Sequence, residues 1–138
     1  MQVASALRDS EHVANLDRYS LKYVNVVDNS TASPTAPFDL RVAAGSHRFS
    51  PNGFRLRFET EINGFLNIVE LASNATSTVG TTSLSGTLIT IDTIMETATP
   101  QFWGDLEHCL NATHDVLETP FFELLTDETI SAMGPSYD

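Results

Sequence analysis

Cysteine and basic residues are scarce in this sequence. It has a single cysteine, Cys109, and seven basic residues among 138. One cysteine excludes a disulfide within the chain and any metal site built from several cysteines. No apolar run approaches the roughly 20 residues that a bilayer-spanning helix needs. The first residues lack the basic start and apolar stretch of a secretory signal peptide, so we expect a soluble protein made in a cytoplasm.

Residues suited to catalysis are not grouped. His108 and His114 are six residues apart and fall on different faces of a helix, so they do not form a metal pair. Cys109 lies in an apolar stripe without a base beside it, which indicates a buried structural thiol. The sequence has no Gly-rich phosphate loop, nucleophile elbow or convincing carboxylate pair. We therefore expect no enzyme activity, no cofactor, no metal and no small-molecule substrate.

The formal charge of −11 is unevenly distributed. All seven basic residues precede residue 58, together with five of the eighteen acids, so residues 1–57 carry +2 and residues 58–138 carry −13. This asymmetry permits one surface that tolerates a polyanion and another that repels it. A solvated acidic surface without a specific partner explains the charge alone equally well.

Residues 54–71 predict a β-hairpin. In "FRLRFETEI", the even-numbered positions are mainly apolar and the odd-numbered positions are charged, which is the period of a half-buried strand. Asn63-Gly64 is the residue pair that a type I′ turn prefers. The resulting register sets Glu70 opposite Arg57, so a cross-strand ion pair is one alternative role for that arginine.

Strands are also expected at 19–27, at 38–44 and, after a loop, in "LSGTLITIDTIM". The small polar stretch 73–83 predicts that loop, which is flexible and about ten residues long. Thr99 and Pro100 have the residue types of a helix N-cap and first helical position, and Thr119-Pro120 repeats this signal. We therefore expect strands within 1–95 and two helices. Their boundaries are 99–118 for the long helix and 119–131 for the short helix, with a tail at 132–138.

The short helix is apolar on nearly every side. Phe121, Phe122, Leu124 and Leu125 follow one another with only Glu123 polar among them. Full burial of each such side chain contributes about 1.5–3 kcal/mol, so an uncovered side favours association. Burial inside the chain's own core is the alternative. The fold expected for residues 1–138 is a single α+β domain, with an antiparallel meander sheet, N-terminal hairpin strands and two C-terminal helices.

This order of elements resembles the coat protein of the single-stranded RNA bacteriophages of the levivirus type. The resemblance is carried by "FRLRFETEI", by "SNATSTVGTTS" in place of the family's loop around the shell axes, and by "TLITIDTIMETATPQFWGDLEHCLNATHDVLETPFFELL". The closing "GPSYD" is similar to the tails of some members. The resemblance implies a homodimer with one continuous sheet, in which each chain's helices interlock with the partner. It also implies assembly in a bacterial cytoplasm into an icosahedral virion shell, with the sheet facing a single-stranded RNA genome.

The resemblance also implies site residues. RNA contacts fall to Arg55 and Arg57, with Arg41 and Arg48 as further candidates. The resemblance assigns seven apolar residues to the dimer interface: Phe102, Leu106, Leu110, Phe121, Phe122, Leu124 and Leu125. The family's sheet also binds an RNA hairpin that represses replicase translation. "SLSG" at 83–86 has neither the Tyr nor the Asn that some members use for this hairpin, so we expect packaging of RNA without that specific recognition. The alternatives are another virion subunit, such as a tail or connector protein, and an acidic extracellular binding module.

Overall fold

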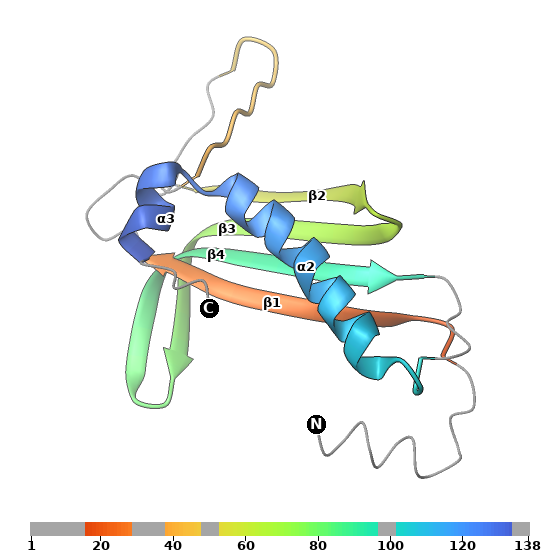
Figure 1. Cartoon of the computed structure of the whole chain (residues 1–138). Coiled ribbons are helices and arrows are strands. Elements are labelled where there is room, and N and C mark those ends of the chain that lie inside the picture. Colours follow the sequence, from red (N-terminus) through yellow and green to blue (C-terminus); the bar gives the residue numbers. More distant parts are fainter. Residues whose placement is uncertain (1–15, 29–37, 48–52, 97–101, 134–138) are drawn as a thin grey trace.

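The structure is a computed structural model that describes residues 16–28, 38–47, 53–96 and 102–133. Within these residues a four-stranded antiparallel sheet carries a long helix across one face, and a short helix follows beside the end of the sheet (Figure 1). The predicted α+β class is confirmed. The strand order is β1 (Tyr19–Asp28), β4 (Thr82–Met95), β3 (Phe65–Val79) and β2 (Arg55–Ile62).

The hairpin of β2 and β3 has the predicted register. Ile62 pairs with Phe65 across the turn, and Arg57 pairs with Glu70. Asn63 and Gly64 both have positive φ, at 52° and 81°, as a type I′ turn requires. The short-range sequence pattern therefore determines this part of the fold.

The loop predicted at 73–83 is wrong, because β3 and β4 continue through it to a tight turn at Gly80 and Thr81. We call residues 73–86 the β3–β4 arm; it bends away from the rest of the sheet (Figure 1). The register shifts between Ala72 and Ala75, where Asn74 has a φ of 57°. A bulge of this kind bends a strand and increases its twist. The threonines and serines are polar enough for a ribbon in water, while β-branched threonine also suits a strand.

The N-terminal strands are arranged differently from the prediction. β1 pairs with β4 and not with the segment 38–44, which forms no strand in the sheet. Phe38 instead forms a bridge to Leu125, and the Asp39 N–H donates a 3.0 Å hydrogen bond to the Leu124 carbonyl. Burial of the Phe38 ring beside the end of the helix explains this pairing. The remainder of an expected N-terminal hairpin lies outside the described residues.

The helices begin and end at other residues than predicted. Helix α2 spans Leu106–Leu124 and continues through Pro120, and α3 spans Asp127–Met133. The expected break at Thr119-Pro120 is therefore wrong, and the proposed cap at Thr99 lies outside the described residues. Pro120 cannot donate a backbone hydrogen bond, which costs a helix interior about 3 kcal/mol. Pro120 and Phe121 are both buried, so their packing offsets this cost.

The core lies between α2 and one face of the sheet. α2 packs on β4, β1 and β3, and its fully buried Leu117 contacts the central strands. The predicted burial of the Cys109 thiol is confirmed. The core cluster consists of Phe38, Val69, Leu71, Ile89, Ile91, Leu117, Phe121 and Leu125. None of the helices in the described ranges is long and apolar enough to cross a membrane.

Candidate RNA-binding face and assembly surfaces

The sheet face opposite the helices carries most of the strand charges. Side chains alternate along each strand, so outside the β3–β4 arm the odd-numbered residues of β2 and the even-numbered residues of the other strands lie on this face. Neither α2 nor α3 covers it (Figure 1). Its described charged residues, which we call the charged face, are Lys22, Arg55, Arg57, Glu59, Glu61, Glu70 and Asp92. Three cations against four carboxylates give a formal charge of −1.

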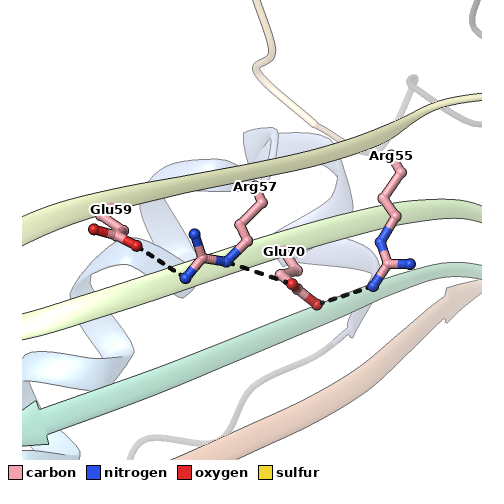
Figure 2. A network of polar contacts seen from close by, with 4 residues as sticks. All are labelled: Arg55, Arg57, Glu59 and Glu70. Carbon is pink, nitrogen blue, oxygen red and sulfur yellow. Dashed lines mark ion pairs between the residues drawn. The ribbon is translucent and has the colours of Figure 1, made fainter.

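The two arginines of this face are held by carboxylates (Figure 2). Arg57 Nη2 lies 2.9 Å from Glu59 Oε1, and Arg57 Nε lies 3.6 Å from Glu70 Oε1. Arg55 Nη2 lies 3.6 Å from Glu70 Oε2, so Glu70 bridges the two guanidinium groups. The cross-strand pair considered for Arg57 from the sequence is therefore confirmed. The arginines and Glu59 are at least half exposed and Glu70 is one-third exposed, so solvent screens each pair to about 0.2–1 kcal/mol.

This network limits what the charged face can do with RNA. A phosphate that approaches Arg57 meets Glu59 and Glu70 at the same guanidinium. The Arg55 side chain is 75% exposed and is the more accessible of the two. The arginines can exchange these weak ion pairs for phosphate contacts, but repulsion from the neighbouring carboxylates reduces the binding free energy that is gained. The geometry suits salt-sensitive contact with a polyanion more than tight binding.

The other two candidate arginines do not join this face. Arg41 belongs to the segment 38–47, which extends away from the sheet (Figure 1). Its side chain is 92% exposed, and Nε lies 3.7 Å from Asp39 Oδ1. The predicted strand at 38–44 is absent from the sheet, and Arg41 lies apart from Arg55 and Arg57 because Phe38 fixes this segment at the end of α2. Arg48 lies outside the described residues.

Three of the residues assigned to a dimer interface are buried by the chain itself. Phe102, Phe121 and Leu125 are only 4–6% exposed. The Phe102 ring packs on Tyr19 with centroids 4.8 Å apart, and Phe121 packs on Tyr23 at 6.2 Å. Burial inside the chain's own core, the alternative considered from the sequence, therefore holds for Phe121 and Leu125, because α2 covers its own sheet. Leu106, Leu110, Phe122 and Leu124 are partly buried and retain surface for a partner.

An apolar groove lies where α2 leaves β2 incompletely covered. Phe58 on β2 is 39% exposed, although it points to the helix side of the sheet. The groove has a volume of about 250 Å³. It is lined by Phe58, Thr60, Ile62, Pro120, Glu123 and Leu124. The alternating pattern of β2 predicts Phe58 on this face. The exposure of Phe58 depends on where α2 lies, and the residues of β2 do not predict that position.

The described residues contain no group of three or more His, Cys, Asp or Glu side chains that could hold a metal ion. Burial raises the pKa of the Tyr19 hydroxyl above its ordinary value; the charge of the neighbouring Cys109 acts in the same direction, and a hydrogen bond with Thr113 opposes it. This hydroxyl lies under α2 in the core layer and not on the charged face. Comparison with family models, curated proteins and solved structures finds no match for the chain.

Proposed function

We propose that this chain is a structural subunit that forms homodimers and assembles into a shell around single-stranded RNA in a bacterial cytoplasm. The resemblance to levivirus coat proteins motivates this function. The observation that carries it is the one-sided sheet, which has its own helices on one face and none of the described helices on the other (Figure 1). Such a subunit can present one surface outward and another inward.

Two further features support assembly. Both edge strands, β1 and β2, have no partner strand on their outer sides within the described residues, and an unpaired edge is a template for contact with another chain. The β3–β4 arm reaches beyond the helix-covered sheet, where it can contact neighbouring subunits around a symmetry axis (Figure 1). The resemblance assigns that role to this region, although here it is a ribbon and not a flexible loop.

RNA packaging within this proposal depends on Arg55 and Arg57 and is non-specific. The charged face is slightly acidic in sum, and Glu70 holds both arginines. Weak contacts repeated over many subunits can retain a polyanion that one subunit binds poorly. We therefore propose binding that weakens steeply as salt is raised, since phosphate contacts release counterions.

The test is expression of the full chain in bacteria, followed by negative-stain electron microscopy of the purified protein. The expected result is closed isometric particles with a high ratio of absorbance at 260 to 280 nm, which nuclease treatment after disassembly removes. Rings or tubes would indicate another virion subunit. Small species without nucleic acid, at all protein and salt concentrations, would overturn the proposal and favour an acidic binding module.

A further inference from the structure

The outer edge of β2 has features that specify a partner. β2 ends the sheet, and no strand of the described residues pairs with its outer side. Phe58, in the middle of the strand, is 39% exposed. Charged residues on an edge strand normally oppose pairing with other chains. In β2, however, the order of the charges favours one register between two antiparallel copies of the strand and opposes the neighbouring registers.

The turn determines which backbone groups face outward. In a two-residue hairpin the residues that flank the turn form a hydrogen-bonded pair, here Ile62 and Phe65. Even-numbered residues of β2 therefore direct their N–H and C=O groups toward β3. The 3.0 Å bond from the Ser73 N–H to the Phe54 carbonyl has the same parity. The residues that direct backbone groups outward are Arg55, Arg57, Glu59 and Glu61.

These four residues form the charge order plus, plus, minus, minus. When two copies of β2 run antiparallel about a two-fold axis at Phe58, Arg55 faces Glu61 of the second copy and Arg57 faces Glu59 of the second copy. Every outward pair then combines opposite charges, and every pair can form the backbone bonds of an antiparallel ladder. Moving the axis to Arg57 or Glu59 sets that residue against itself. The charge order therefore selects one register.

The helix side of the strand fits the same register. Phe58 meets Phe58 of the second copy in a non-hydrogen-bonded pair, where Cα atoms are about 4.5 Å apart and side chains are close. This contact covers a ring that the chain leaves partly exposed. The groove beside it, which includes Leu124, then borders its counterpart across the axis. Leu124 is only partly buried in the single chain, and it would lie where the two grooves meet.

The opposite edge offers no comparable pattern. On the same face of β1, Lys22 is the one charge among the side chains that the structure describes. Val24 on that edge is 59% exposed, but an exposed valine specifies neither direction nor register. Two of the three ion pairs of Figure 2 join the arginines to Glu70 from the inner side of the strand, which leaves the outer side open. The third joins Arg57 to Glu59 of the same strand, so pairing through β2 exchanges or shares this contact with the second copy.

We propose that two copies of this chain associate through β2, antiparallel about a two-fold axis at Phe58, and join their four-stranded sheets into one sheet of eight. The inference rests on the proposed function in taking a second copy as the partner. It adds the edge, the direction and the register, and it assigns Arg55, Arg57, Glu59 and Glu61 to the interface.

The first test is cross-linking of cysteine variants in a Cys109→Ala background, with the full chain under mild oxidation. Phe58→Cys sets two cysteines opposite each other at a spacing that a disulfide accepts. We expect it to give a reducible covalent dimer as the main species on a gel. Thr60→Cys, which faces Leu56 of the second copy, and Val24→Cys on the other edge should stay mainly uncross-linked. Preferential cross-linking of either control would overturn the proposed register.

The second test exchanges charges. An acidic variant, Arg55→Glu with Arg57→Glu, and a basic variant, Glu59→Arg with Glu61→Arg, should each lose self-association in sedimentation. A one-to-one mixture should restore dimers, because every pair is then complementary. Lys22→Glu, on the same face of β1, is the matched control and should leave dimers intact. Circular dichroism verifies folding; where a charge variant is unfolded, the cysteine test alone decides.

The outcomes separate this inference from the proposed function. Wild-type particles with RNA, together with failed cross-linking at position 58, would overturn β2 pairing and leave the shell subunit standing. Dimers linked at position 58 without particles would support β2 pairing and count against the shell. A wild-type chain that stays monomeric at all concentrations would overturn both.

Discussion

The Thr93 hydroxyl on β4 donates a 2.6 Å hydrogen bond to Oδ1 of Asn67 on the adjacent strand β3. The two residues face each other in the register, and both are fully buried on the helix side of the sheet. A polar pair in this position contributes little while both members are present. It becomes costly when one member is removed, because the other is left buried without its partner.

Thr93→Val should therefore lower the free energy of unfolding by about 1–3 kcal/mol, although the two side chains have nearly the same shape. Thr93→Ser keeps the hydroxyl and serves as the control, with a smaller loss from the missing methyl group. Urea unfolding, followed by circular dichroism, measures both. Equal stability of Thr93→Val and wild type would show that Oδ1 of Asn67 finds another donor.

Removal of the Glu70 carboxylate should increase RNA binding. Glu70→Gln releases Arg55 and Arg57 from their shared partner. For each further phosphate that these arginines then bind on a single strand, the slope of log affinity against log salt should steepen by about 0.7. Titration of a fluorescent single-stranded RNA at several salt concentrations measures this slope. Asp92→Asn makes the same charge change on the same face without a contact to either arginine; an equal effect from both would mean that net charge, and not release of the arginines, governs binding.

The sequence predicts local parts of this fold well. The β2–β3 hairpin depends on an alternating pattern and on Asn63-Gly64, and both signals lie within a few residues of the contacts they determine. The β3–β4 arm differs from the prediction because its serines and threonines have loop-like composition, while their pairing depends on partners across the turn. Composition over a short window does not contain that information.

Long-range packing explains the remaining differences. Pro120 resembles a helix start, but burial of Pro120 and Phe121 on the sheet keeps α2 continuous. For the same reason Phe121 is covered within the chain and does not depend on a partner. The charges of Arg55 and Arg57 are evident from the sequence. That Glu70 forms an ion pair with both of them depends on side-chain geometry between two strands.

Two leucines of α2 should respond differently to truncation, because one lies in the core and the other borders the β2 groove. Leu117 is fully buried, so Leu117→Ala should lower the free energy of unfolding by about 2–5 kcal/mol at any protein concentration. Leu124 is partly buried, and Leu124→Ala should affect unfolding less but shift association to higher protein concentration. Unfolding and sedimentation over a concentration series test the pair; a Leu124→Ala variant that associates as wild type would remove this residue from the interface.

Stability should also fall at alkaline pH because of Tyr19. Burial raises the pKa of its hydroxyl in the folded chain above the ordinary value of 10.0, so the folded chain holds this proton more tightly than the unfolded chain does. The associated stability is fully present below about pH 10 and is lost as pH rises from the unfolded toward the folded pKa.

Urea unfolding between pH 8 and pH 11 should therefore show a decline in the free energy of unfolding that is smaller in Tyr19→Phe than in wild type. Since the Tyr19 ring packs on Phe102 below the start of α2, the same pH rise should loosen this end of the helix first, and hydrogen exchange of the α2 amides would locate the change. A decline of equal size in wild type and Tyr19→Phe would assign the alkaline sensitivity to other groups.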